Sequence, residues 1–257
     1  MTTALVTGAS AGIGRAFAVG LAARGHDLVL VARDRTRLDE LAAQLIAAHR
    51  VAVEVLRADL LDRADLEVVA TRVGDDARPV DVLVNNAGFG TYGRFVDLDV
   101  AHEVEEVELN VVALLRLSHA ALAAMQARGS GAILNVGSVA GYQPDPRSAT
   151  YGATKAFVLS FTHALRTEAR GSGVQVMVVC PGYTHTEFHE RAGLGPSSVP
   201  ELLWQTPDEV VTVALRDLDR RRAVSIPGVL NRTAAALSSM APPGISGRVA
   251  GLVVKRT

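Results

Sequence analysis

The sequence predicts a doubly wound α/β fold, in which helices cover both faces of one parallel sheet. Short apolar runs alternate with helix-like segments from the first residues onward, which is the pattern of parallel strands joined by crossover helices. The apolar runs are also nearly continuous rather than alternating, as expected for strands that are buried on both faces. We therefore expect a single domain over residues 1–257, with about seven strands.

The expected elements follow one another without an internal repeat. The strands are the short apolar runs, and they occupy residues 3–6, 27–32, 51–58, 80–85, 131–137, 174–180 and 223–227. The helices are the longer segments between them, and they occupy residues 11–25, 35–49, 62–73, 100–128, 148–169 and 207–218. Asp34 precedes the second helix and can act as its N-cap. Two stretches lie outside the alternation: a Gly-, Pro- and Ser-rich loop at 185–206, which we assign to the substrate side, and a C-terminal segment at 228–257.

The composition suits one large α/β domain and excludes several classes of protein. Hydrophobic residues make up 49% of the 257 residues and aromatic residues only 4%, so Ala, Val and Leu must fill the core. A net charge of −1 gives no sign of nucleic-acid binding. Cys180 is the only cysteine, which rules out an internal disulfide and favours the reducing cytoplasm. We expect no signal peptide and no membrane span of ~20 residues, since Arg116 and His119 interrupt the most apolar run.

A glycine-rich turn, TGASAGIG at 7–14, joins the first strand to the first helix. In folds of this kind, ligands bind at the carboxyl ends of the strands. Gly8, Gly12 and Gly14 would let the backbone approach a pyrophosphate, and the N-terminus of the helix would present aligned N–H groups to it. Tight turns also produce glycine clusters, but this position favours a dinucleotide site on a Rossmann-type domain.

The end of the second strand bears on which dinucleotide binds. NAD-binding folds usually carry Asp or Glu there, which binds the ribose 2′-hydroxyl. Here Ala32 occupies the strand end and the cationic Arg33 follows, while Arg15 adds a second cation within the glycine-rich turn. Two guanidinium groups suit a 2′-phosphate, which they can bind bidentately. The sequence therefore favours NADP(H) over NAD(H), although a solvated Arg33 would leave the same pattern.

Four polar residues form a possible acid–base set. Ser138 ends the fifth strand, and Tyr151 and Lys155 stand four positions apart in the helix that follows, which places them on one face. Asn110 lies in the long helix before that strand. A nearby ammonium lowers the pKa of a phenol, which makes it a better general acid or base. We therefore expect Lys155 to lower the pKa of Tyr151, and Ser138 to hold a substrate oxygen beside it.

With these motifs the chain resembles the short-chain dehydrogenase/reductases, along almost its whole length. It looks most like the NADP(H)-preferring members that act on carbonyl and alcohol substrates. The matching residues occur in the family's order: Thr7, Gly8, Gly12, Ile13, Gly14, Asp59, Asn85, Asn86, Ala87, Gly88, Asn110, Ser138, Tyr151, Lys155, Pro181, Gly182 and Thr186.

The resemblance implies a role for each matched position. Tyr151 would exchange a proton with the substrate oxygen as a hydride moves to or from the nicotinamide, with Ser138 steadying that oxygen. Lys155 would also bind the nicotinamide ribose, and Asn110 would hold a water that relays protons to Lys155. Arg15 and Arg33 would bind the 2′-phosphate. The remaining cofactor contacts would come from Gly8, Ser10, Gly12, Ile13, Gly14, Asp59, Leu60, Asn86, Ala87, Gly88, Pro181, Gly182 and Thr186.

The substrate side and the termini are less defined by the sequence. Tyr92, Gln143, Tyr183 and Trp204 are candidates for the substrate pocket, although each could equally be packing. We expect no metal site, although His185, Glu187 and His189 lie close in sequence, since the chemistry needs no Lewis acid. Seven cations and no acid occur between 220 and 257. This segment could contact a membrane surface, but packing on the domain or on a second subunit is the commoner role.

Two other functions stay open beside a carbonyl/alcohol oxidoreductase. The chain could be a catalytically silent protein that senses NADP(H), or an isomerase or dehydratase on the same scaffold. By analogy with the family we expect a homodimer or homotetramer. It would form through small residues on the outer faces of two helices, namely Ala113, Ala120, Ala153 and Ala156.

Overall fold

The computed structural model of the protein describes residues 2–192 and 200–240. Within these residues the chain forms one seven-stranded parallel sheet with the strand order β3-β2-β1-β4-β5-β6-β7, which confirms the predicted fold class. The strands are β1 (Thr3–Thr7), β2 (Asp27–Ala32), β3 (Val53–Arg57), β4 (Val82–Asn85), β5 (Gly131–Val136), β6 (Val174–Val179) and β7 (Val224–Ser225). Several strands are one to three residues shorter than expected. In β7 only Val224 and Ser225 pair in register with β6.

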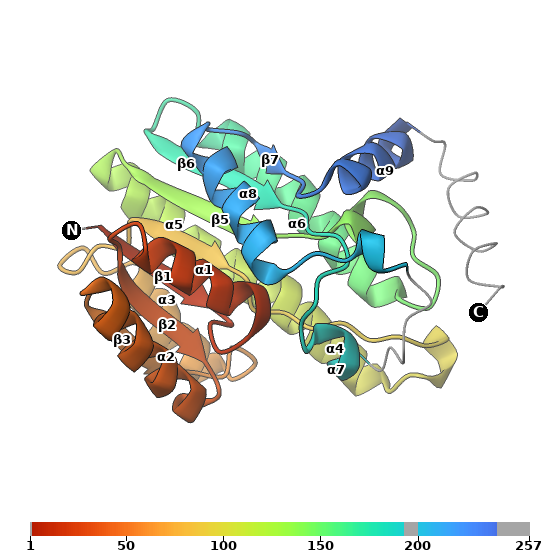
Figure 1. The fold of residues 1–257 in the computed structure, drawn as a ribbon, viewed down its shortest axis with the longest axis horizontal. Helices are drawn as coiled ribbons and strands as arrows, with labels where there is room; N and C mark the ends of the chain where they lie inside the picture. Colours follow the sequence, from red (N-terminus) through yellow and green to blue (C-terminus); the bar gives the residue numbers. More distant parts are fainter. Residues whose placement is uncertain (1, 193–199, 241–257) are drawn as a thin grey trace.

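Helices cover both faces of the sheet (Figure 1). The helices are α1 (Gly12–Ala22), α2 (Arg35–His49), α3 (Arg63–Val73), α4 (Val100–Val107), α5 (Leu114–Arg128), α6 (Ala149–Glu168), α7 (Phe188–Arg191), α8 (Pro207–Asp219) and α9 (Val229–Met240). One hydrophobic core joins α1, α2 and α8 to one face of the sheet, and a second joins α3, α5 and α6 to the other. Phe17 is the only aromatic residue among the largest fully buried side chains of the described chain, so aliphatic residues fill the core as the composition predicted.

The long helix expected at 100–128 is helical throughout but not uniform. Between α4 and α5 the residues Glu108–Ala113 form a π-helical turn, η2, which carries Asn110. Such turns occur often at functional sites. Ala113 is 1% exposed and packs in the core, so the prediction that it lies on an outer face was wrong. Ala153 and Ala156 are exposed as expected, while Ala120 is half-buried.

The same stretch bears on the expectation that the chain has no membrane span. With a mean hydropathy of 1.4, Val100–Arg128 is long and apolar enough to cross a membrane by length and composition alone. A helix that packs on a core passes the same test. The apolar residues of this stretch include Leu117, Ala121 and Met125, which are each at most 1% exposed and pack against the sheet. Their packing in the core accounts for the high hydropathy.

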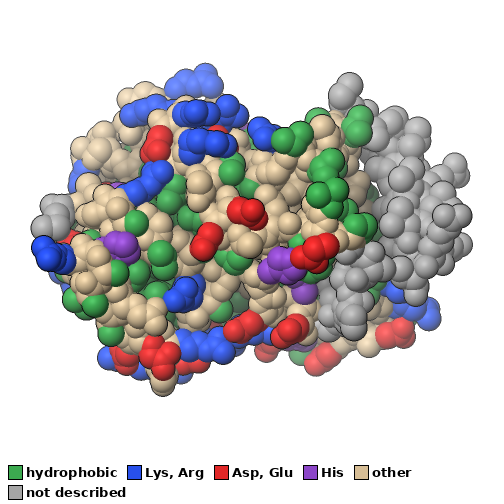
Figure 2. Space-filling model, in the orientation of Figure 1, with side chains coloured by type: hydrophobic (Ala, Val, Ile, Leu, Met, Phe, Trp, Pro, Cys, Tyr) green, Lys and Arg blue, Asp and Glu red, His purple; other side chains and the backbone are tan. Residues whose placement is uncertain are grey.

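The two irregular stretches contain more structure than the sequence indicated. The loop at 185–206 includes α7 and the short 3-10 helix η4 (Glu201–Leu203), and residues 193–199 lie outside the described residues. The C-terminal segment begins with α9, on which Val229, Leu230 and Leu237 are exposed, and hydrophobic side chains gather at the upper right of the face shown in Figure 2. The three cations at 220–222 are exposed, whereas Arg248, Lys255 and Arg256 lie outside the described residues.

Candidate active site

The carboxyl ends of β1 and β4 lie side by side, where the strand order reverses and ligands bind in folds of this class. Thr7 joins the two ends. Its buried hydroxyl accepts hydrogen bonds from the backbone N–H groups of Asn86 and Ala87, at 2.9 and 3.0 Å, and donates to Val84 O at 3.3 Å. The Asn86 side chain donates back to Thr7 O at 2.9 Å. The predicted cofactor residues of the first and fourth strands therefore share one rigid edge.

The glycine-rich turn packs so closely against this edge that side chains are excluded. A Cβ atom on Gly14 would lie 2.3 Å from Gly8 O and 2.4 Å from Asn86 Nδ2. Gly8 and Gly12 have φ values of 66° and 53°, in the left-handed region that favours glycine. A Cβ on Gly12 would meet Thr186 at 3.0 Å. The turn from β1 and the loop after β6 thus come together, as a site for an extended dinucleotide requires.

A hollow of about 320 Å³ opens beside this turn at the N-terminus of α1. Arg15 lines it and donates to Gln44 Oε1 at 2.9 Å. Arg37, which the sequence analysis missed, also lines it and forms an ion pair with Glu187 at 3.0 Å. The lining residues are Ser10, Ala11, Gly12, Arg15, Arg37, Glu40, Leu41, Gln44 and Glu187. Two cations around an open volume at a helix N-terminus fit the phosphate groups of a dinucleotide.

Three other predicted residues of the adenosine end are spread more widely. The Arg33 side chain is 67% exposed and lies 3.9 Å from Asp59, so it is free to reorient toward a ligand. Asp59 is fixed locally, because its carboxylate accepts from Leu61 N at 3.1 Å. Leu60 is 7% exposed and packs in the core beside Asp59.

The predicted acid–base residues come together at the ends of β5 and α6. The Ser138 hydroxyl lies close enough to the Tyr151 hydroxyl to lower its pKa. Lys155 Nζ lies 5.6 Å from the centre of the Tyr151 ring and donates to Val136 O at 2.9 Å. Lys155 is 6% exposed. The structure therefore places the phenol, the hydroxyl and the ammonium in one group, as the sequence predicted.

Asn110 reaches this group from the π-helical turn. Its Nδ2 atom donates to Phe89 O at 2.8 Å and to Thr154 Oγ1 at 3.2 Å, and its Oδ1 atom accepts from Phe89 N at 3.1 Å. A Cβ on Gly88 would lie 2.7 Å from Asn110 Oδ1 and 3.8 Å from Lys155 Nζ. The two side chains therefore meet beside Gly88, where a larger residue would separate them.

The protonation of the pair differs from the prediction. Burial raises the pKa of Tyr151 to about 12, and the hydrogen bond from Ser138 lowers it only in part. The expectation that the pKa of Tyr151 is lowered was therefore wrong in its net direction, because burial is the largest effect on this pKa. Burial also lowers the pKa of Lys155 to about 8. The physical reason is that both groups lose water together, and desolvation outweighs their mutual attraction.

A series of aromatic rings in mutual contact begins at Tyr151 and continues through Phe188 and His189 to Trp204. Phe188, which the sequence analysis missed, has its ring centre 5.3 Å from that of Tyr151. The rings of Tyr183 and His189 lie 5.5 and 4.8 Å from that of Trp204. Two of the predicted pocket residues, Tyr183 and Trp204, thus belong to one cluster of rings.

The other two predicted pocket residues have separate partners. The Tyr92 ring faces the guanidinium of Arg147 at 6.0 Å. Gln143 accepts from Ser238 of α9 at 2.9 Å. Helix α9 also reaches the loop after β6, because a Cβ on Gly182 would lie 2.4 Å from the side chain of Asn231. Within the described residues, α9 therefore helps to enclose the substrate side.

The three residues that resemble a metal cluster in sequence have other partners. His185 pairs with Glu201 at 3.0 Å, Glu187 with Arg37 and Arg191, and His189 packs on Trp204. Their side chains are therefore engaged separately.

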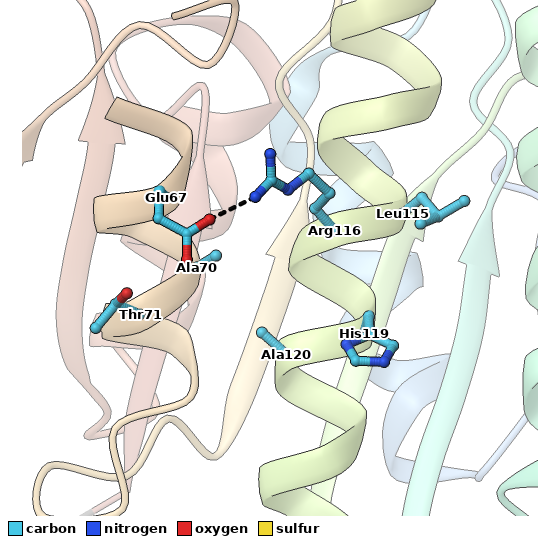
Figure 3. A pocket seen from close by; sticks show the side chains of 7 residues that line it. All are labelled: Glu67, Ala70, Thr71, Leu115, Arg116, His119 and Ala120. Carbon is cyan, nitrogen blue, oxygen red and sulfur yellow. Dashed lines mark hydrogen bonds and ion pairs between the residues drawn. The ribbon is translucent and has the colours of Figure 1, made fainter. Parts of the chain in front are cut away.

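A second hollow of about 290 Å³ lies away from these residues, between α3 and α5 (Figure 3). Glu67 on α3 and Arg116 on α5 form an ion pair across it, and Leu115 and His119 lie on its α5 side. None of the predicted catalytic or cofactor residues lines it.

The chain is similar to known proteins in both sequence and fold. Residues 2–195 match the family model described as short chain dehydrogenase. Sulfoacetaldehyde reductase 2 of Chromohalobacter salexigens is 41% identical over 214 residues, which cover 82% of this chain and 84% of that protein.

Two solved structures are similar over nearly the whole chain. A short-chain dehydrogenase from Sphingobium yanoikuyae in complex with NADPH is 43% identical, with a TM-score of 0.85 and coverage of 94% of this chain and 96% of the other. The bulky-bulky ketone specific alcohol dehydrogenase from Comamonas testosteroni is 37% identical, with a TM-score of 0.81 and coverage of 94% and 95%. With the ordered motifs and the seven-stranded sheet, these matches show that the chain belongs to the short-chain dehydrogenase family.

Proposed function

We propose that the protein is an NADP(H)-dependent oxidoreductase that interconverts a carbonyl compound and an alcohol, with Tyr151 as the general acid or base. The observation that carries the proposal is the group of side chains at the end of β5. The Ser138 hydroxyl acts on the phenol of Tyr151, and Lys155 Nζ lies 5.6 Å from the centre of the Tyr151 ring and next to Gly88, in the segment that follows β4.

The choice of NADP(H) is supported from two sides. Arg15 and Arg37 line the hollow beside the glycine-rich turn, and Arg33 is exposed just after β2, so three guanidinium groups are candidate partners for a 2′-phosphate. The similar Sphingobium protein is described in complex with NADPH. When bound, the cofactor would supply or accept the hydride, and the protein supplies position and the proton.

The side chains of the protein have separate roles in proton transfer and substrate binding. With a pKa of about 12, Tyr151 is protonated at neutral pH, which is the form that can donate a proton to a carbonyl oxygen. Ser138 orients that oxygen by a hydrogen bond. Lys155, with a pKa of about 8, is largely cationic at neutral pH and favours the negative charge that develops on the phenol oxygen. The ring cluster of Phe188, Tyr183 and Trp204 limits the access of water and favours substrates with an apolar group.

The test is the loss of NADPH absorbance with a panel of carbonyl compounds, which should include sulfoacetaldehyde and ketones with two bulky substituents. Wild type should turn over at least one member of the panel. Tyr151→Phe should bind NADPH with unchanged affinity but lose turnover by about 10²-fold or more, the size of a general-acid contribution. Equal turnover by the two proteins would refute the role of Tyr151.

The same experiment separates the two alternatives that the sequence left open. A silent NADP(H)-sensing protein would bind NADPH but turn over no substrate in the panel. An isomerase or dehydratase would convert its substrate without net consumption of NADPH.

A further inference from the structure

Two buried glutamates on α4 flank the candidate catalytic tyrosine. Glu106 is 0% exposed and Glu103 is 4% exposed, one helical turn apart on the same side of the helix. Carboxylates are almost never buried to this degree unless they are paired. Yet one oxygen of each, Oε1, lacks a hydrogen-bond partner within the described residues. Their burial therefore needs a reason.

Glu106 holds the loop that packs on the ring of Tyr151. Its Oε2 atom accepts from both donors of Thr91, from the backbone N at 3.1 Å and from Oγ1 at 3.0 Å. Gly90, the preceding residue, packs against the phenol ring so closely that a Cβ atom there would lie 2.8 Å from Tyr151 Cδ2. One turn later, Asn110 holds Phe89 of the same loop. The position of the loop beside Tyr151 thus depends on two adjacent turns of one helix.

Lys155 lacks a direct counter-ion. Lys155 is only 6% exposed, and its ammonium donates a hydrogen bond to Val136 O. In the described part of the chain, no carboxylate lies within ion-pair distance of this ammonium. Glu106 is the carboxylate whose charge acts on Lys155: it raises the pKa of Lys155 against the effect of burial. Lys155 in turn lowers the pKa of Glu106, which burial and the charge of Glu103 together raise to about 7.

The groups that face Glu106 are few. Glu103 comes from its own helix, Lys155 and Tyr151 come from α6, and the adjoining loop contributes the uncharged Thr91. A negative charge on Glu106 raises the pKa of Tyr151 as well as that of Lys155, so it favours the protonated form of both.

We propose that Glu106 is a positioning residue for the Tyr151–Lys155 pair, whose carboxylate keeps the ammonium of Lys155 charged and whose bonds to Thr91 hold Gly90 against the ring of Tyr151. The functional part of this proposal rests on the oxidoreductase function proposed above. The ionisation of Lys155 does not, and it can be measured without turnover.

Glu103 offers a matched control. It is buried on the same helix, its Oε2 atom accepts from Thr150 Oγ1, and its Oε1 atom is likewise without a hydrogen-bond partner in the described chain. Unlike Glu106, it is not among the charges that act on Lys155. Glu103→Gln and Glu106→Gln therefore make the same chemical change at two comparable sites. Only Glu106→Gln is expected to lower the pKa of Lys155.

The first test is an NMR titration of the lysine side chains. Lys155 and Lys255 are the only lysines in the sequence, so lysine-selective ¹³C labelling gives two Cε signals, which Lys255→Arg assigns. In wild type the Lys155 signal should titrate with a midpoint near 8 and show a minor step near 7, where Glu106 gains its proton. In Glu106→Gln the step should vanish and the midpoint should fall by about 0.5 pH units or more. In Glu103→Gln the midpoint should not fall.

The second test is the pH profile of kcat for carbonyl reduction. Glu106→Gln keeps an amide oxygen that can accept both bonds from Thr91, so kcat in mildly acidic buffer should stay within about twofold of wild type. Its alkaline limb should move to lower pH, because Lys155 and Tyr151 both lose protons more readily. Glu106→Ala also removes the acceptor and should lower kcat at every pH, with NADPH affinity unchanged.

The outcomes separate this inference from the proposed function. If wild type does not turn over NADPH with any carbonyl compound, the proposed oxidoreductase function is refuted. The NMR titration still shows whether Glu106 affects the ionisation of Lys155. A Lys155 midpoint that is the same in Glu106→Gln and wild type, or that falls equally in Glu103→Gln, overturns the role of Glu106. Should Glu106→Gln fail to fold, the absence of the minor step in wild type overturns it instead.

Discussion

Gly14→Ala tests whether the glycine-rich turn is shaped by close packing of the backbone. A Cβ atom at this position would lie 2.3 Å from Gly8 O and 2.4 Å from Asn86 Nδ2. Favourable contacts between heavy atoms need about 3.5–4.0 Å, so the turn must open by roughly 1 Å. Over-packing of this kind costs about 1–3 kcal/mol. The N-terminus of α1 begins at this turn, so the displaced backbone is the surface that would face the cofactor.

The expected result is weaker cofactor binding. At about 1.4 kcal/mol for each tenfold change, a cost that falls wholly on binding raises the Kd for NADPH by roughly 5- to 150-fold, and any part that falls on folding should appear as a lower Tm instead. Gly74→Ala is the control, because its Cβ would have an ordinary contact of 3.6 Å and its φ is −86°. Fluorescence titration with NADPH and thermal unfolding measure both effects. If Gly14→Ala binds NADPH like wild type with an unchanged Tm, the steric argument is refuted.

Three further predictions concern the cofactor, a helix cap and the assembly. Arg33→Asp should raise the Kd for NADPH relative to NADH by about tenfold or more, since a carboxylate repels the 2′-phosphate and suits a free 2′-hydroxyl; an unchanged ratio would place the phosphate elsewhere. Thr206→Ala removes the capping box at the start of α8 and should cost about 1 kcal/mol, or 2–4 °C in Tm, whereas Thr206→Ser should retain it. Light scattering should give a dimer or tetramer for wild type. Val104→Glu, on the exposed side of α4 where Val104 is 54% exposed, should shift the mass toward a monomer, and a monomeric wild type would contradict the predicted assembly.

The parts of the fold that the sequence predicted best have strong local signals. The second strand and the second helix begin and end at the predicted residues, Asp27–Ala32 and Arg35–His49. Asp34 lies between these two elements and caps the N-terminus of the helix by accepting a hydrogen bond from Arg37 N. The glycine-rich turn and the Tyr151–Lys155 pair are local patterns of the same kind. The structure brings them together with Ser138 and Asn110 as expected.

The parts that could not be predicted depend on contacts between distant segments. Glu103 and Glu106 lie in a run, HEVEEVEL, that looks like the solvated side of a helix, and only the packing of α4 on α6 and on the loop at Thr91 buries them. The pKa of Tyr151 was predicted in the wrong direction for a related reason, because spacing along a helix reveals a neighbouring charge but not the loss of water. Helix α9 gave no distinct signal within a segment notable for its cations.

The contact between Asn231 of α9 and Gly182 bears on how such enzymes diversify. The sheet and the glycine-rich turn are complete before α9 begins, while α9 lies at the far end of the described chain and is joined to the substrate side through Asn231 and Ser238 (Figure 1). A helix that follows the complete sheet can therefore be exchanged between relatives without rebuilding the glycine-rich turn. Chimaeras joined near Gly228 would be a direct way to transplant substrate preference from one relative to another.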